Sequence, residues 1–158
     1  MNNFSESNRL TPNLIAQIPF FEGLDREYLE MLAEKMQLYT VDKGRLIISE
    51  GDSTQRMYFI IEGTVKIFRN TFKGRTENIC DLCAPTYFGE MSIIDGGPRS
   101  ASVKADTDVV LVELNWEDVR YLFEDKPEIM CYIFKNIGST LSMRLRRVNS
   151  LYSNLATI

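Results

Sequence analysis

The sequence predicts a mainly β domain, a small sandwich or barrel flanked by helices, with a long helix at its C-terminal end. Short runs rich in Val, Ile, Phe and Tyr, such as MYFIIEGTVKIF at 57–68, alternate with glycine-containing turns between residues 40 and 115. Beyond Pro127, apolar residues recur every three or four positions, which indicates one long helix. The length of 158 residues fits one domain with an appended element.

The N-terminal part predicts an arm followed by a helix. Residues 1–13 are polar and contain Thr11-Pro12, so we expect a flexible N-terminal arm. A short apolar stretch then leads to Gly23, and Asp25 stands where a helix N-cap is expected. Leu29, Leu32 and Met36 follow at helical spacing, which predicts one amphipathic helix.

The central part, residues 14–126 with that first helix, is predicted to form the β domain. Its strand-like runs are separated by turn signals, each containing glycine. These signals are Lys43-Gly44, Gly51-Asp52, Glu62-Gly63, Lys73-Gly74 and Gly96-Gly97-Pro98. Asn115 is the expected N-cap of a second helix, and residues 127–158 form the predicted long C-terminal helix.

The composition argues against an enzyme and against a metal or haem cofactor. The chain has no histidine, which is the usual general base, the commonest metal ligand and the axial haem ligand. Cys80, Cys83 and Cys131 form an odd set without a framework spacing, so we expect reduced, buried thiols and a cytoplasmic protein. No apolar run is long enough to span a membrane, so no membrane partner is expected.

Residues 88–100 have the composition of an anion-binding turn. Gly89 permits close approach of the backbone to a ligand, and the amides at the start of a following helical turn, near Met91 and Ser92, favour an anion. The Gly96-Gly97-Pro98 turn then brings back Arg99, whose guanidinium can hold two phosphate oxygens. Glu90 can accept a sugar hydroxyl. The alternative interpretation is a surface ion pair between Arg99 and Glu90.

The segment FGEMSIIDGGPRSASV, residues 88–103, resembles the phosphate-binding cassette of the cyclic nucleotide-binding domain family. This family includes catabolite activator proteins and the regulatory subunits of cyclic-AMP-dependent protein kinase. The upstream segment DKGRLIISEGDSTQRMYFIIEGTVKIF, residues 42–68, is similar to the glycine-punctuated strands of the same family. The likeness covers roughly residues 14–155. It implies a β-roll, that is, a jelly-roll-like double-stranded β-helix.

The resemblance also implies a cyclic nucleotide sensor that binds its ligand without hydrolysing it. Gly89 and the amides near Met91 and Ser92 would hold the phosphate, Arg99 would pair with it, and Glu90 would accept the ribose 2′-hydroxyl. Serine at position 100, as in the catabolite activators, favours cyclic AMP over cyclic GMP as the regulatory ligand. The alternative function is a protein-interaction module with a vestigial pocket. The expected ligand-binding residues are Gly89, Glu90, Met91, Ser92, Arg99, Ser100, Ala101 and Asn149.

The long C-terminal helix is predicted to mediate dimerisation and to act as a lid. An apolar stripe along it predicts a homodimer through residues 134–155, with Gly138 at the junction to a segment packed on the β domain. The stripe consists of Met130, Phe134, Ile137, Leu141, Leu145, Val148, Tyr152 and Leu155.

The charge distribution does not favour DNA binding by this chain alone. Residues 127–158 hold four basic side chains and one acidic one, on a chain of net charge −4. The segment NSLYSNLATI lies where the resemblance places a hinge. Two interpretations follow: a sensor that lacks its DNA-binding domain, or a stand-alone sensor that acts on another effector protein.

Overall fold

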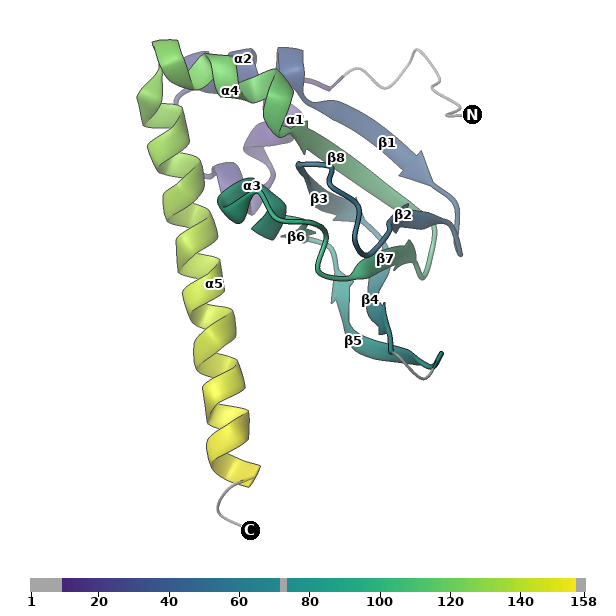
Figure 1. Cartoon of the computed structure of the whole chain (residues 1–158). Helices are drawn as coiled ribbons and strands as arrows, with labels where there is room; N and C mark the ends of the chain where they lie inside the picture. The colour runs from purple at the N-terminus through teal and green to yellow at the C-terminus, as the bar shows by residue number, and fades with distance from the viewer. Residues whose placement is uncertain (1–9, 72–73, 156–158) are drawn as a thin grey trace. The chain divides into compact units, whose positions relative to one another are not determined.

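The computed structural model describes residues 10–71 and 74–155 and confirms the mainly β architecture with flanking helices (Figure 1). The described chain forms two compact units, with the boundary between Tyr121 and Leu122. The first unit contains two four-stranded antiparallel sheets, in the orders β1-β8-β3-β6 and β2-β7-β4-β5. The strands are β1 Gln37–Val41, β2 Leu46–Ile48, β3 Arg56–Glu62, β4 Thr64–Asn70, β5 Thr76–Cys83, β6 Thr86–Phe88, β7 Ser102–Ala105 and β8 Val109–Asn115.

The interior of the roll contains an apolar cluster to which both sheets contribute. Alternation along β3 directs Tyr58 and Ile60 into this cluster, whereas Phe59 faces the other side of the sheet. Most of the glycines expected at turns adopt positive φ angles, which bulkier residues rarely adopt, but Gly97 is not among them. The cluster consists of Ile48, Tyr58, Ile60, Val65, Phe88, Val103, Ala105, Val109 and Leu111.

Short N-terminal helices cover the outer face of the first sheet. They are α1 Pro12–Ala16, the 3₁₀ helix η1 Pro19–Phe21 and α2 Arg26–Lys35. Phe20 and Phe21 pack against Phe59 of β3, with ring centroids 5.1 and 4.9 Å apart. The N-terminal arm predicted over 1–13 is too long, because Thr11 caps α1 through its hydroxyl and Leu10 is buried. Residues 1–9 of that prediction lie outside the described residues.

The three cysteines are exposed, so the prediction that they are buried is wrong. Cys80 and Cys83 lie on β5, the last strand in its sheet order. Such an edge strand has a neighbour on only one side, and nearly every residue of β5 is exposed. Apolar composition alone did not reveal this edge position.

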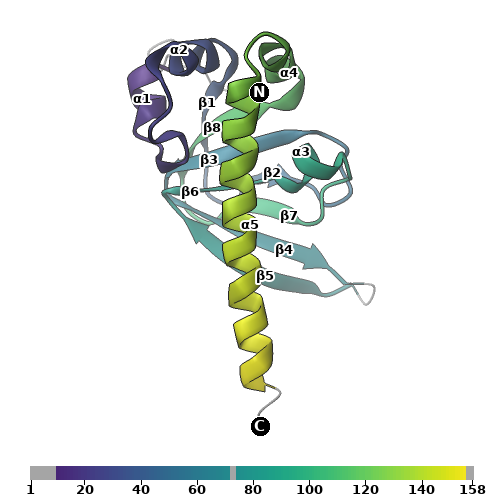
Figure 2. The same ribbon diagram turned by 90° about the vertical axis from the view of Figure 1, so that its left-hand side faces the viewer.

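The helices at the C-terminal end are α4 Trp116–Asp125 and α5 Pro127–Leu155. Asn115 caps α4, since its side-chain oxygen accepts a hydrogen bond from the amide of Glu117. The second unit consists mainly of α5, which Figure 2 shows as one continuous helix. Its range includes Gly138. No helix in the described part of the chain is long and apolar enough to cross a membrane.

Burial along α5 changes at Gly138. Before this residue, Ile129, Ile133 and Ile137 are buried, so Met130 and Phe134 of the predicted stripe lie beside the buried face, not on it. After Gly138, no described side chain of the helix is buried. The later stripe residues Leu145, Val148 and Tyr152 are exposed, Leu141 is half-buried, and the side chain of Leu155 lies outside the described residues.

Candidate functional site

The predicted anion-binding segment, residues 88–100, begins at the end of β6, precedes β7 and contains the short helix α3, Met91–Asp95. This is the single helical turn that the sequence predicted. Gly96, with φ of 67°, ends α3 in the left-handed conformation. Figure 1 shows α3 in the first unit, and it contacts β3.

Gly89 is required by two features of the structure. Its φ is +84°, and a Cβ atom at this position would lie 2.7 Å from the carbonyl oxygen of Arg56 and 2.9 Å from Nη1 of Arg99. The backbone of β3 at Arg56 therefore lies so close to residue 89 that a larger side chain would overlap it. Only glycine fits at this position.

We expect Gly89→Ala to lower the free energy of unfolding by at least about 2 kcal/mol, since it combines backbone strain with a steric overlap. Gly44→Ala is the matched control. Gly44 has φ of +83° but nothing within 4 Å of an added Cβ, so this variant introduces strain alone. Urea denaturation compares the two, and equal losses would contradict a role for the close approach at Gly89.

Arg99 is buried, with an exposed fraction of 4%. Its Nη1 atom donates hydrogen bonds to the carbonyl of Gly89, at 3.0 Å, and to the hydroxyl of Ser92, at 2.9 Å. Its backbone is fixed as well, because its amide donates to the carbonyl of Asp52 and its carbonyl accepts from the amide of Gly51. The Gly51-Asp52 turn thus fixes the position of the Arg99 backbone within the cassette.

The other two guanidinium nitrogens of Arg99, Nε and Nη2, are buried without a hydrogen-bond partner among the described residues. Such groups are rare, because losing water without a replacement is costly. Burial lowers the pKa of Arg99 from its ordinary value, while Tyr58 and Asp52 act in the opposite direction. Arginine nevertheless remains charged in proteins. The site therefore holds a buried cation with two donors ready for two oxygens of an anion.

The surface ion pair between Arg99 and Glu90 is excluded as an interpretation, because both side chains are 4% exposed. Ser92 is also buried, and its hydroxyl donates to the carbonyl of Gly89 at 3.2 Å. Hydrogen bonds therefore bring Gly89, Ser92 and Arg99 together in the first unit, and Glu90, the residue after Gly89, is buried as well.

The remaining predicted ligand-binding residues are less enclosed. Met91 is half exposed, and its sulfur accepts a hydrogen bond from the exposed Ser100 hydroxyl at 3.6 Å. Ala101 is half-buried next to β7. Asn149 is exposed on α5 in the second unit, so its contact with a ligand stays a prediction.

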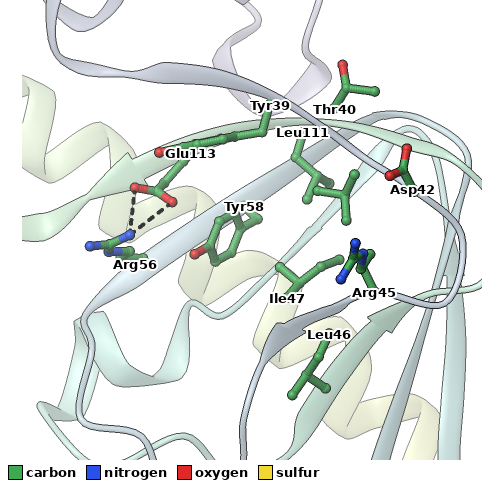
Figure 3. Close-up of a pocket in the computed structure, with 11 residues that line it drawn as sticks. Tyr39, Thr40, Asp42, Arg45, Leu46, Ile47, Arg56, Tyr58, Leu111 and Glu113 are labelled. Carbon is green, nitrogen blue, oxygen red and sulfur yellow. Dashed lines mark hydrogen bonds and ion pairs between the residues drawn. The ribbon is translucent and has the colours of Figure 1, made fainter. Parts of the chain in front are cut away.

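A pocket of about 530 Å³ lies in the first unit and contains a cluster of charged and phenolic side chains (Figure 3). Nη1 of Arg56 lies 3.3 Å from one carboxylate oxygen of Glu113 and 3.4 Å from the other. Burial, with Glu113 as the next cause, raises the pKa of Tyr58 to about 12 and raises that of Tyr39 as well. Burial alone would lower the pKa of Arg56, but Glu113 and Tyr58 together raise it.

Arg56, Tyr58 and Glu113 were not predicted from the sequence as a group. A signal for one of them was present, because Glu113 interrupts the apolar run VVLVELN and its alternation places it inside the roll. Within residues 10–71 and 74–155, no group of three or more His, Cys, Asp or Glu side chains could hold a metal ion.

Comparison with known proteins places this site in a family. A family model for the cyclic nucleotide-binding domain matches residues 39–126, which is more than half of the chain and includes the cassette. The CRP-like cAMP-activated global transcriptional regulator of Mycobacterium tuberculosis is 33% identical over 143 residues, which are 90% of this chain and 62% of that protein. A cyclic nucleotide-gated potassium channel of Mesorhizobium japonicum is 35% identical over 116 residues, which are 73% of this chain and 31% of the channel.

The fold agrees with these relatives. The crystal structure of the catabolite activator protein of Thermus thermophilus superposes with a TM-score of 0.71 at 31% identity, over 87% of this chain and 63% of that chain. The chain thus spans less than two thirds of the length of the two transcriptional relatives, and a third of the channel.

Proposed function

The chain belongs to the cyclic nucleotide-binding domain family, and we propose that it is a sensor that binds cyclic AMP, in preference to cyclic GMP, without hydrolysing it. The observation that carries this proposal is the buried guanidinium of Arg99 with two unpartnered nitrogens. A buried cation of this kind is stabilised by a ligand anion that supplies two oxygens. The cyclic phosphate of the nucleotide has such oxygens and one negative charge.

Each cassette residue has a role in this proposal. Nε and Nη2 of Arg99 hold the phosphate oxygens, and the amides of Met91 and Ser92 add donors beside Gly89. The short helix α3 would not define an anion site by itself, but the buried guanidinium next to it does. Glu90 accepts the ribose 2′-hydroxyl, a group that a free phosphate lacks. Ser100 and Ala101 line the phosphate side, and Asn149 approaches the base.

Cyclic AMP is favoured because the M. tuberculosis relative is described as cAMP-activated and a Thermus thermophilus relative, 32% identical, as a cyclic AMP receptor protein. The Ser100 hydroxyl makes only a long contact to a thioether sulfur, so it can turn to donate to a phosphate oxygen. One relative is a potassium channel and another a transcriptional regulator, so similar domains occur in proteins with different effector functions.

The output proposed for this chain passes through α5. Two chains pair along the exposed stripe of this helix, and ligand binding changes its position. The receiving part is either a DNA-binding domain, as in a transcriptional regulator, or a separate effector protein. An interaction module with a vestigial pocket is disfavoured, because a pocket without a ligand would retain the cost of burying Arg99.

Titration calorimetry of the chain with cyclic AMP tests the proposal. We expect saturable one-site binding, weaker binding of 5′-AMP, which lacks the cyclic phosphate, and recovery of intact cyclic AMP by chromatography afterwards. Competition against a fluorescent cyclic nucleotide ranks cyclic AMP against cyclic GMP. Absence of binding by both cyclic nucleotides at millimolar concentration would overturn the function, and a preference for cyclic GMP would overturn the choice of base.

A further inference from the structure

Three side chains connect the pocket of Figure 3 to the cassette: Arg56, Tyr58 and Glu113. Tyr58 lies directly opposite Glu113 on β8 and directly opposite Phe88 on β6. Its ring stacks on that of Phe88, with centroids 5.2 Å apart and planes at 20°. Phe88 is the residue before Gly89, so one cross-strand row leads from the glutamate to the phosphate-binding turn.

The backbone of the same strand also reaches the cassette. The carbonyl of Arg56 faces Gly89 at the closest approach described above, and Gly89 in turn accepts the hydrogen bond from Arg99. The charged end of Arg56 lies on Glu113. The pair Arg56–Glu113 is therefore attached to the cassette through both the backbone and the Tyr58 side chain.

The two charges of this pair are unequally buried. The Glu113 side chain is 7% exposed, whereas that of Arg56 is 40% exposed. Their N···O distances of 3.3 and 3.4 Å are longer than the 2.7–2.9 Å typical of a tight charge-assisted hydrogen bond. The carboxylate is thus incompletely neutralised by the arginine. Its field acts through protein, where solvent screens it less than it screens an exposed charge.

The Tyr58 phenol is influenced by two buried residues of opposite charge. Glu113 raises the pKa of Tyr58 and Arg99 lowers it, so the two charges act on its ionisation in opposite directions. Arg99 is likewise influenced by Tyr58, Arg56 and Glu113. In the empty site, the negative carboxylate therefore partly compensates the buried guanidinium.

We propose that the Arg56–Glu113 pair sets the affinity of the cassette for the anionic part of the nucleotide, Glu113 weakening and Arg56 strengthening it. The carboxylate stabilises Arg99 while the site is empty and repels the phosphate when it arrives. Arg56 limits that repulsion. This inference rests on the proposed function.

The competing explanation is that the pair only joins β3 to β8. In that case the loss of either partner loosens the same contact, so both single variants weaken binding. The electrostatic explanation instead requires opposite signs, because Glu113→Gln removes a negative charge from the region of the phosphate and Arg56→Gln removes a positive one.

The experiment measures the dissociation constant for cyclic AMP by calorimetry for both single variants and the double variant. We expect several-fold tighter binding for Glu113→Gln, several-fold weaker binding for Arg56→Gln, and a value near that of the wild type for the double variant. Arg56→Lys retains the positive charge but not the paired N–H donors of the guanidinium. Its affinity should be much closer to that of the wild type than the affinity of Arg56→Gln. Arg45→Gln is the matched control, since Arg45 lines the same pocket but is exposed, and its shift should be smaller.

Weaker binding by both single variants, or no change in either, would overturn the inference while leaving the proposed function intact. Thermal unfolding checks that each variant folds. If Glu113→Gln does not fold, the contrast between Arg56→Gln and Arg56→Lys decides, and equal weakening by both contradicts the electrostatic role. A wild type that binds no cyclic nucleotide overturns the proposed function and, with it, this inference.

Discussion

Arg99→Ala should weaken the binding of cyclic AMP at least ~30-fold, since losing a buried charge-assisted contact costs about 2–5 kcal/mol. The variant removes Nε and Nη2, the two nitrogens without a hydrogen-bond partner among the described residues. A phosphate entering the site would then lose its water without gaining a counter-charge. Calorimetry on wild type and variant gives the ratio of dissociation constants directly.

Two controls separate this effect from general damage. Arg69→Ala also removes an arginine of the first unit, but Arg69 is exposed on β4 and ion-paired with Glu50, and its loss should leave the affinity within twofold. Circular dichroism on heating shows whether Arg99→Ala still folds, because this variant also removes the bonds to Gly89 and Ser92. A folded Arg99→Ala protein with the affinity of the wild type would contradict the assignment of the cassette.

Leu145→Asp should convert a dimer into a monomer at micromolar concentration. Leu145 is 60% exposed, and Val148 and Tyr152, on the same face of α5, are 45% and 70% exposed. Exposed apolar residues aligned over two turns of a helix are typical of an interface. Pairing two such stripes removes apolar area from water, and a carboxylate in the centre would be buried without a partner.

Sedimentation velocity of wild type and variant measures this effect. Ser150→Asp is the matched control, because it places the same charge on the opposite face of the same part of α5, where the dimer should tolerate it. If the wild type is a monomer both with and without cyclic AMP, the proposed pairing through residues 134–155 and the signalling that depends on it are wrong.

Much of the local structure could be predicted from the sequence. Short-range rules located the glycine turns, the capped start of α4, the single turn of α3 and the continuous helix from Pro127. The prediction failed where neighbours in space decide the outcome. In the first part of α5 the buried face carries Ile129 and Ile133, whereas the predicted stripe ran through Met130 and Phe134. An apolar period of three to four residues does not distinguish two adjacent faces of a helix.

The cassette could be predicted from the sequence, through its resemblance to the family and its local turn chemistry, because Gly89, Glu90 and Arg99 lie within one short segment. The burial of Arg99, with two nitrogens that have no partner among the described residues, depends on the tertiary structure, since the Gly51-Asp52 turn and Gly89 contact it from separate parts of the chain. The same holds for Arg56 and Glu113, which are far apart in sequence and meet only because β3 pairs with β8. Strand order depends on the packing of the whole roll, so alternation along a single strand predicts which face a side chain occupies but not which side chain lies opposite it.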